Sequence, residues 1–280
     1  MVSALGERIA DLLAPLRDDP QASAILCDID GTLAPIVADP SDASVPEETR
    51  RTLRALSRGF GMVACVSGRR AVDARALVGV DELTYAGNHG LELLEPGGGE
   101  IAVDPALGDR GHAASDFVRA LDAVALRDAG LRLEDKGPIQ ALHWRSAPDP
   151  ERAEERALAI AAAAREAGLE PRLGRRVLEL RPNVEVDKGT TVRGLVERSR
   201  TSMALFAGDD RTDLDAFAAL RSMVAEEALR VGVCLGVASD EAPPELATAS
   251  DAVVAGPVEL SRVLEALAGS VAGRARAQGG

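Results

Sequence analysis

The stretch Ala24-Ile25-Leu26-Cys27-Asp28-Ile29-Asp30-Gly31-Thr32-Leu33 decides the fold of this chain. Its first four residues are apolar, and a short apolar run that ends in turn residues predicts a buried strand. Two aspartates separated by one residue follow, and then a Gly-Thr turn. Because side chains alternate along an extended chain, Asp28 and Asp30 would share a face if the strand continued.

Two carboxylates at the end of a buried strand destabilise a fold unless a cation or hydrogen bonds offset their charge. A divalent metal is the simplest such cation, and ligands that are all oxygen favour Mg²⁺. A helix N-cap or an Asx turn after an edge strand explains the same two aspartates without a metal. The aspartate pair alone therefore leaves both interpretations open.

Length and composition bound the class of protein. A chain of 280 residues is long enough for one large or two modest domains. A net charge of −13 opposes sequence-independent binding to nucleic acid. No apolar run reaches the roughly 18 residues of a membrane span. The N-terminal segment contains acidic residues, which predict an amphipathic helix and not a signal peptide. The three cysteines lie in apolar runs without metal-type spacing, which indicates a reducing compartment, so we expect a cytoplasmic protein. We also expect it to be a monomer.

Lysine is almost absent from the chain. Of 32 basic residues, only Lys136 and Lys188 are lysine. These two positions are candidates for sites that need a compact, strongly hydrated ammonium and not a planar guanidinium. Chance retention of two lysines is the alternative.

A repeated strand–turn–helix pattern fills both ends of the chain and predicts an α/β core, a Rossmann-like doubly wound parallel sheet. The predicted strands are 24–27, 61–66, 83–86, 204–207, 231–237 and 252–254. The predicted helices are 3–18, 46–57, 70–78, 188–198, 215–220 and 258–267. We expect residues 270–280 to be disordered.

The pattern changes in the middle of the chain to helix, two strands, helix, two strands. These elements are predicted at 112–127, 131–135, 139–145, 151–167, 170–173 and 176–181. Such an order is typical of an α+β unit with its own sheet. We therefore expect a catalytic core of residues 1–107 and 184–280 and an inserted cap domain of residues 108–183.

Polar motifs follow several predicted core strands, at the edge where ligands gather in such sheets. Ser67 follows the second strand and, with backbone N–H groups, can bind a phosphoryl oxygen; capping the helix 70–78 is its alternative role. Lys188 begins a helix, which is the unfavourable end for a cation, and this favours a functional cation over a solvated surface lysine. The turn 208–213 carries Asp209, Asp210 and Asp213, which suit a hard cation or, alternatively, helix capping.

Together with the Asp28/Asp30 pair, these make four motifs. In this order and spacing they resemble the signature motifs of the haloacid-dehalogenase superfamily of phosphotransferases. The stretches D-G-T-L-A-P-I, V-S-G-R, A-G-N-H-G-L-E, E-D-K-G-P, L-H-W-R, L-E-L-R-P and G-D-D-R-T-D-L-D-A-F resemble the trehalose-6-phosphate phosphatase family over residues 25 to about 220. Two positions depart from that family: Trp144 stands where Tyr is more frequent, and Leu214 where an acid is common.

The resemblance implies a Mg²⁺-dependent phosphatase that converts trehalose 6-phosphate to trehalose and phosphate through an aspartyl-phosphate. By resemblance, Asp28 is the nucleophile, Asp30 the general acid/base, and Ser67 and Lys188 hold the phosphoryl oxygens. The metal ligands it implies are Asp28, the backbone carbonyl of Asp30, Asp209 and Asp213.

The cap would supply specificity through Glu134, Lys136 and Glu179. Arg145 and Asn88 are further substrate-binding candidates, and the remaining ones are Thr32, Gly68, Arg69 and Asp210. We expect Trp144 to pack inside the cap and His89 to be a core histidine.

Two alternatives to this function stay open. One keeps the chemistry but takes another glycosyl phosphate, such as mannosyl-3-phosphoglycerate. The other is a catalytically silent module that binds a sugar phosphate. In each case the partner is a small molecule, and neither nucleic acid nor a membrane is expected.

Overall fold

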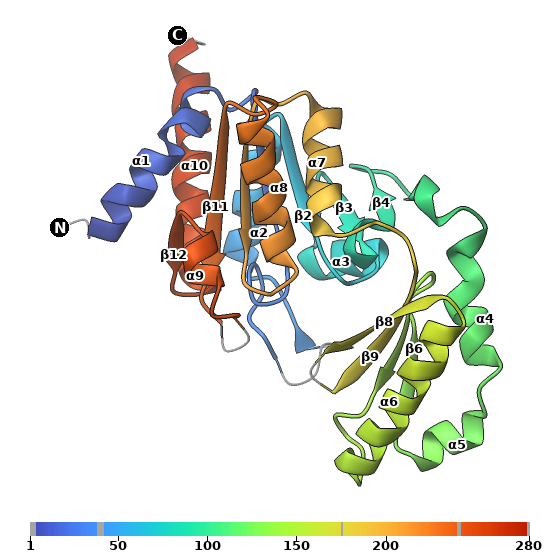
Figure 1. Cartoon of the computed structure of the whole chain (residues 1–280). Coiled ribbons are helices and arrows are strands. Elements are labelled where there is room, and N and C mark those ends of the chain that lie inside the picture. The colour runs from blue at the N-terminus through green and yellow to red at the C-terminus, as the bar shows by residue number, and fades with distance from the viewer. Residues whose placement is uncertain (1–3, 38–41, 175, 240–241, 279–280) are drawn as a thin grey trace. The chain divides into compact units, whose positions relative to one another are not determined.

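The computed structural model describes residues 4–37, 42–174, 176–239 and 242–278 (Figure 1). The chain divides into two compact units, a core of Met1–Ala102 with Val186–Gly280 and a cap of Val103–Glu185. The predicted boundaries, 107/108 and 183/184, lie within five residues of these. In the described part of the chain, none of the helices is both long enough and apolar enough to cross a membrane.

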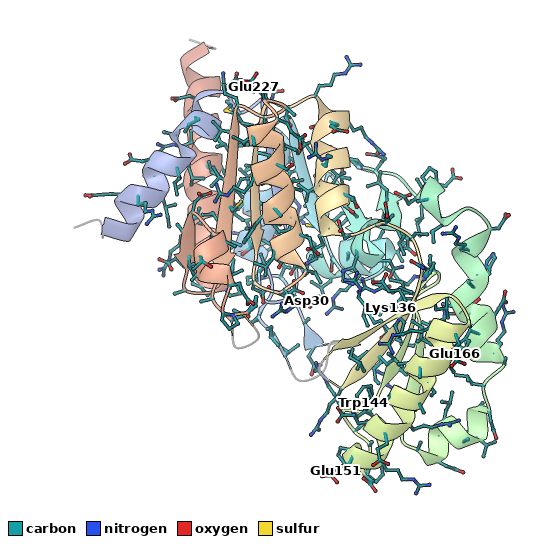
Figure 2. All side chains as sticks on the ribbon, in the orientation of Figure 1. Asp30, Lys136, Trp144, Glu151, Glu166 and Glu227 are labelled. Atoms are coloured by element: carbon teal, nitrogen blue, oxygen red, sulfur yellow. The ribbon has the colours of Figure 1, made fainter. Side chains whose placement is uncertain are left out.

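The cap is an antiparallel sheet with helices on one of its faces. Its strand order is β6-β7-β9-β8. The strands are β6 (Arg132–Asp135), β7 (Gln140–His143), β8 (Leu169–Gly174) and β9 (Val177–Pro182). Leu142 and Leu178 are register partners, and both are fully buried together with side chains of α6 (Pro150–Glu166). Trp144 lies beside α6 in this apolar cluster, as expected, and is 2% exposed (Figure 2).

The predicted helix 112–127 is wrong as a single element. The cap contains instead the short helix η3 (Pro105–His112), then α4 (Ala113–Arg119) and α5 (Ala123–Asp128). The break occurs because Asp122 caps α5: its carboxylate accepts the N–H groups of Val124 and Ala125 at 2.8 and 3.2 Å. Asp122 thus marks the start of a second helix, which the apolar periodicity of the sequence did not predict.

The core sheet has eight strands in the order β12-β11-β10-β1-β2-β3-β4-β5. They are β1 (Ser23–Cys27), β2 (Met62–Val66), β3 (Thr84–Gly87), β4 (Glu92–Leu94), β5 (Ile101–Val103), β10 (Met203–Gly208), β11 (Val231–Val237) and β12 (Ala252–Val254). Strands β12 to β3 are parallel, and β4 is antiparallel to β3. The predicted α/β parallel sheet is therefore confirmed, and the unpredicted strands β4 and β5 extend it.

Helices cover both faces of this sheet, as doubly wound topology requires. One face packs against α1 (Ala4–Asp18), α2 (Glu47–Ser57), α3 (Ala71–Val78) and α10 (Pro257–Gln278). The other packs against α7 (Lys188–Ser199), α8 (Asp213–Ala225) and α9 (Leu246–Ala249). Because α10 continues to Gln278, the expected disorder from residue 270 is wrong over the described part of that segment.

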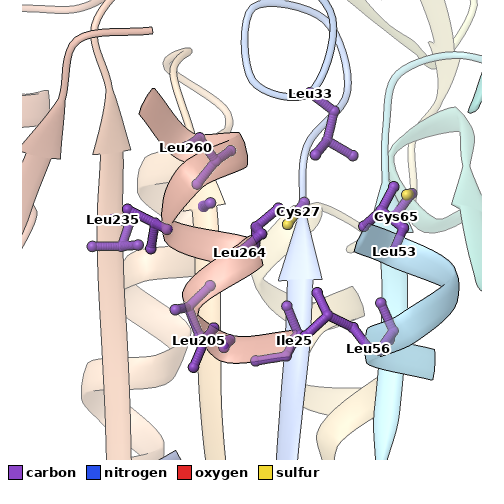
Figure 3. Close-up of a cluster of buried hydrophobic side chains, with 14 of the residues drawn as sticks. Ile25, Cys27, Leu33, Leu53, Leu56, Cys65, Leu205, Leu235, Leu260 and Leu264 are labelled. Atoms are coloured by element: carbon purple, nitrogen blue, oxygen red, sulfur yellow. The ribbon is translucent and has the colours of Figure 1, made fainter. Parts of the chain in front are cut away.

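Strand β1 is buried on both sides because its side chains alternate between these two layers. Ala24 and Leu26 belong to one apolar cluster, whereas Ile25 and Cys27 belong to the other. Figure 3 shows Ile25 and Cys27 among leucines from α2 and α10. The continuous apolar run that precedes Asp28 follows directly from this two-sided burial.

Helix α1 is part of the first layer. Its residues Ile9, Leu13 and Leu16 are buried in the same cluster as β1. We expect Leu16→Ala to lower the free energy of unfolding by about 2–5 kcal/mol, because Leu16 is fully buried and the substitution leaves a cavity. Denaturant unfolding would measure the change.

The control for this substitution is Val258→Ala in α10, where the side chain is 68% exposed and the expected change is within about 0.5 kcal/mol. Equal effects of the two substitutions would contradict the assignment of α1 to the core.

Candidate active site

The polar motifs of the core meet at the carboxyl ends of neighbouring parallel strands. Asp28 follows β1, Ser67 follows β2, Asn88 follows β3 and Asp209 follows β10. The backbone N–H of Asp28 donates to the carbonyl of Ala207 at 2.9 Å, so Asp28 extends the ladder between β1 and β10. The sheet thus brings together residues that are far apart in the sequence.

Lys188 lies at the centre of this edge and is 2% exposed. Its Nζ lies 2.8 Å from Oδ1 of Asp28 and 2.6 Å from Oδ1 of Asp213. The interpretation of Lys188 as a solvated surface lysine is therefore wrong. Helix α7 tolerates a cation in its first turn because Asp187 caps the helix, accepting the N–H of Thr190 at 2.7 Å.

Asp28, Asp209 and Asp213 form an acidic cluster. One carboxylate oxygen from each lies within 4.8 Å of the other two, and all three residues are buried. Such a set of oxygen ligands could hold a divalent metal ion. Asp30 contributes its side chain elsewhere, so its predicted ligand, the backbone carbonyl, stays a prediction.

Electrostatics favour a cation in this cluster. Burial raises the pKa of Asp209 to about 6, although hydrogen bonds from Ser239 and Thr32 oppose the shift. Burial also raises the pKa of Asp28, although the charge of Lys188 opposes the shift. The pKa of Asp213 is raised by burial too, again against the charge of Lys188. The single ammonium of Lys188 therefore does not neutralise the three carboxylates, and their oxygen atoms suit a metal ion.

The turn after β10 uses its carboxylates in two ways. The Asp213 carboxylate accepts the N–H groups of Asp209 and Asp210 at 2.8 and 2.9 Å. The Asp210 carboxylate accepts those of Thr212 and Asp213 at 2.7 and 3.0 Å, and it lies 3.8 Å from Lys188. Asp210 thus closes the turn before α8, but the N-cap position of that helix is Thr212, which makes no side-chain capping hydrogen bond, so the capping interpretation is not confirmed. Asp209 is left to face the loop after β1.

The loop after β1 packs directly on Asp209. The Thr32 hydroxyl donates to Oδ1 of Asp209 at 2.8 Å, and Thr32 is fully buried. Gly31 has a φ of +87°, and a Cβ there would lie 2.1 Å from Oδ2 of Asp209. Only glycine allows this approach, so Gly31 and Thr32 together orient Asp209.

Asp30 has a different cationic partner from Asp28. Nε and Nη2 of Arg69 donate to the two carboxylate oxygens of Asp30, each at 2.7 Å. Figure 2 labels Asp30, which lies in the loop after β1. The neighbouring carboxylates of the D-x-D motif are therefore held apart by two cations from different elements, Lys188 and Arg69.

Ser67 is 2% exposed, and its hydroxyl accepts the N–H of Arg69 at 3.2 Å. Helix α3 begins at Ala71 without a side-chain cap, so the capping interpretation of Ser67 is wrong. Gly68, the next residue, packs closely against the ring of His89. A Cβ at Gly68 would lie 2.7 Å from Nε2 of that ring.

The loop after β3 is fixed to the loop after β2. Asn88 and His89 have φ values of +50° and +58° and are buried. The N–H of Asn88 donates to the carbonyl of Arg69 at 2.7 Å, and that of His89 to the carbonyl of Ser67 at 2.9 Å. These contacts agree with a histidine that holds its loop.

In the cap, the predicted binding residues gather on the sheet face opposite the helices. Glu134, Ala141 and Glu179 are register partners across β6, β7 and β9. Nζ of Lys136 donates to Oε1 of Glu179 at 3.0 Å, and Figure 2 labels Lys136 at the end of β6. Arg145 lies just after β7 and is exposed.

Two residues of this polar face were missed from the sequence. His143 contacts Glu134, with Nε2 at 2.6 Å from Oε2, and Arg181 donates through Nε to Oε2 of Glu179 at 3.0 Å. A signal existed, since Arg181 follows Glu179 by two residues and alternation along β9 puts both on one face. Across an antiparallel pair, His143 falls on the same face as Glu134 for the same reason.

Comparisons with known proteins find relatives that match most of this chain. The family model described as trehalose-phosphatase matches residues 26–244. A trehalose-phosphate phosphatase of Mycolicibacterium paratuberculosis is 39% identical over 208 residues, which cover 71% of this chain and 51% of that protein. A trehalose 6-phosphate phosphatase of Zea mays is 31% identical over 257 residues, which cover 86% of this chain and 68% of that protein. The chain thus spans about half the length of the first of these relatives.

A solved structure shares the fold. The C-terminal domain of a trehalose-6-phosphate phosphatase from C. albicans superposes with a TM-score of 0.72 at 24% identity, covering 92% of this chain and 96% of that one. The sequence motifs, the architecture and the match over most of the chain lead to one conclusion: the chain belongs to the trehalose-phosphatase family.

Proposed function

We propose that the chain is a Mg²⁺-dependent phosphatase that hydrolyses trehalose 6-phosphate to trehalose and phosphate. The observation that carries this proposal is the buried carboxylate of Asp28, held by Lys188 inside an acidic cluster at the carboxyl end of β1. A nucleophile for phosphoryl transfer needs this setting, in which its own charge is kept and the charge of the phosphoryl group is offset.

The carboxylates of Asp28, Asp209 and Asp213, with the backbone carbonyl of Asp30, would hold the metal. When bound, Mg²⁺ supplies positive charge that offsets the developing charge on the phosphoryl oxygens. An all-oxygen donor set supports Mg²⁺ over metals that prefer nitrogen or sulfur ligands.

Two displacements make up the proposed reaction. An oxygen of Asp28 attacks phosphorus, the bond from phosphorus to the sugar oxygen breaks, and Asp30 donates a proton to that oxygen. Water then attacks phosphorus and gives a proton back to Asp30, and the bond between Asp28 and phosphorus breaks. Lys188, already hydrogen-bonded to Asp28, and the hydroxyl of Ser67 hold the phosphoryl oxygens.

Arg69 must change partner for Asp30 to act as a proton donor. Both Asp30 oxygens now accept hydrogen bonds from Arg69, and an oxygen that donates a proton cannot also accept one from the same direction. The substrate phosphate is a dianion that would attract the guanidinium. We infer that Arg69 turns from Asp30 to the substrate when the substrate binds.

The sugar would be recognised by polar groups, because aromatic residues make up only 2% of the chain. Glu134, Lys136 and Glu179 supply acceptors and a donor for hydroxyl groups. The further binding candidates are Thr32, Gly68, Asn88, Arg145 and Asp210. Of these, Thr32 and Asp210 act here through Asp209 and the turn after β10.

We also infer a cytoplasmic monomer. All three cysteines are free and buried, which fits a reducing compartment. Sedimentation velocity would test the oligomeric state, and a sedimentation coefficient of a dimer would overturn this inference.

Phosphate release from trehalose 6-phosphate, with and without Mg²⁺ and beside a panel of other sugar phosphates, tests the proposal. We expect metal-dependent turnover with a strong preference for trehalose 6-phosphate. Preference for another glycosyl phosphate, such as mannosyl-3-phosphoglycerate, would keep the chemistry and overturn the substrate. No turnover by folded, metal-loaded protein would favour a silent binding module.

The role of Asp28 as nucleophile is tested by Asp28→Asn. We expect kcat to fall by at least about 10³-fold, because an amide neither attacks phosphorus nor forms the covalent intermediate. Asp81→Asn is the matched control, since that side chain is 80% exposed and its loss should leave kcat within about twofold. Wild-type turnover by the Asp28→Asn variant would exclude Asp28 as the nucleophile.

For Arg69, we expect Arg69→Gln to lower kcat/KM about 10- to 100-fold, because a charge-assisted contact to phosphate is lost. KM should rise, since the phosphate contact is also made in the bound ground state. Arg51→Gln is the control, with a side chain that is 76% exposed. A normal KM for the Arg69→Gln variant would mean that Arg69 serves Asp30 alone.

Metal affinity should depend on pH with a defined sign. Protons and the metal compete for Asp209, whose pKa is raised to about 6 in the metal-free protein. Affinity for Mg²⁺ or Mn²⁺ should therefore fall as the pH decreases, by at least about tenfold per unit below this pH. Calorimetric titration at pH 5, 6 and 7.5 measures this. Equal dissociation constants at pH 5 and 7.5 would contradict it.

A further inference from the structure

His143 is a residue of the cap that the proposed reaction does not use. We propose that His143 is a positioning residue for sugar recognition: it fixes the carboxylate of Glu134 so that one oxygen of that carboxylate is presented to a substrate hydroxyl. This inference rests on the proposed function, because it assumes that the polar face of the cap sheet binds a phosphorylated sugar.

The two side chains are diagonal neighbours on one face of the sheet. Arg132 pairs with His143 and Glu134 pairs with Ala141 across β6 and β7, so both side chains emerge on the same side. Nε2 of His143 lies 2.6 Å from Oε2 of Glu134. Trp144, the next residue, points to the opposite side and is buried in the apolar cluster of the cap, which anchors the end of β7.

The direction of this hydrogen bond follows from the charge of Glu134. The contact with His143 is the main cause of a lowered pKa of Glu134, with Lys136 and Arg132 contributing, so Glu134 is a carboxylate near neutral pH. A carboxylate can only accept, and Nε2 therefore carries the hydrogen. Oε2 is engaged by the ring, whereas Oε1 forms no hydrogen bond to a side chain or backbone group of the described residues. Oε1 is thus free to accept one from a hydroxyl.

Glu134 needs such a partner more than Glu179 does. It lies on the edge strand β6, and its side chain is 43% exposed. A glutamate without such a partner loses rotamer freedom when it binds a ligand, which weakens binding. Glu179 lies on an inner strand and is already held by Lys136 and Arg181. His143, on the inner strand β7 and 20% exposed, restricts Glu134 before the sugar arrives.

The decisive experiment is a double-mutant cycle between His143→Leu and Glu134→Gln, read as kcat/KM for trehalose 6-phosphate divided by kcat/KM for p-nitrophenyl phosphate. The aryl phosphate has no sugar hydroxyls, so this ratio isolates sugar recognition from phosphoryl transfer. We expect His143→Leu to lower the ratio about tenfold, mainly through the KM for trehalose 6-phosphate. His143→Gln should recover most of the loss, since its amide N–H can replace Nε2–H.

The substitutions should not be additive. In the Glu134→Gln background, His143→Leu should change the ratio by less than about twofold, because the carboxylate that His143 positions is already absent. His112→Leu, which replaces an exposed histidine of the cap, is the matched control and should leave the ratio unchanged. Additive losses, or an equal loss for both substrates, would overturn the proposal and indicate a merely structural histidine.

Failure of the proposed function would look different. If the wild-type protein prefers another sugar phosphate, the cycle is run on that substrate, and the same coupling supports the role of His143 while the trehalose assignment is lost. If the wild-type protein hydrolyses the aryl phosphate but discriminates among no sugar phosphates, the role of His143 is overturned and the phosphatase chemistry stands.

Discussion

The active-site end of the core depends on one buried ammonium. Lys188 is hydrogen-bonded to Asp28 and Asp213, and breaking such a buried pair by removing one partner typically costs 3–5 kcal/mol. The surrounding structure is arranged to keep this group in place. Asp187 caps the helix that would otherwise oppose a cation in its first turn, and the Asp213 carboxylate also accepts two backbone N–H groups. The arrangement joins the loop after β1, the start of α7 and the turn after β10.

The same constraint explains why lysine survives in a chain that otherwise uses arginine. A guanidinium prefers a planar pair of acceptors, as Arg69 finds in the two oxygens of Asp30. Lys188 instead meets single oxygens of two different carboxylates, which a tetrahedral ammonium can satisfy. The other lysine, Lys136, also binds one oxygen of a carboxylate, that of Glu179. Both lysines are thus engaged, in keeping with the interpretation of their scarcity.

The core could be predicted from the sequence because strands that are buried on both sides are apolar at every position. Ala24–Cys27 is apolar without interruption since its alternate residues enter two different apolar layers. The acidic motifs that end such strands stand out for the same reason. Elements of three or four residues, such as β4 and α9, carry too few residues to show a period, and Asp122 inside an apolar pattern hid the break between α4 and α5.

The partners within the site are harder to predict than its members. Asp28, Lys188 and Asp209 could be named from their motifs, but which oxygen each group contacts depends on the packing of loops far apart in the sequence. Thr32 shows this: its motif makes it a substrate-binding candidate, but the motif does not reveal that its hydroxyl donates to Asp209, 177 residues away. His143 shows it on the cap, where only the pairing of β6 with β7 brings the ring to Glu134.

The two units differ in how they hold their charges, and the proposed function gives a reason for this difference. In the core, Asp28, Asp213 and Lys188 are buried and locked by mutual contacts, which suits the proposed phosphoryl transfer, since that chemistry needs charges that do not reorganise during the reaction. On the cap, Glu134 is 43% exposed and is held at one oxygen only. A group that reads hydroxyls must stay open to them, so it can be oriented from one side but not enclosed. Under the proposed function, chemistry and specificity place opposite demands on burial, and the division of the chain into two units would meet both.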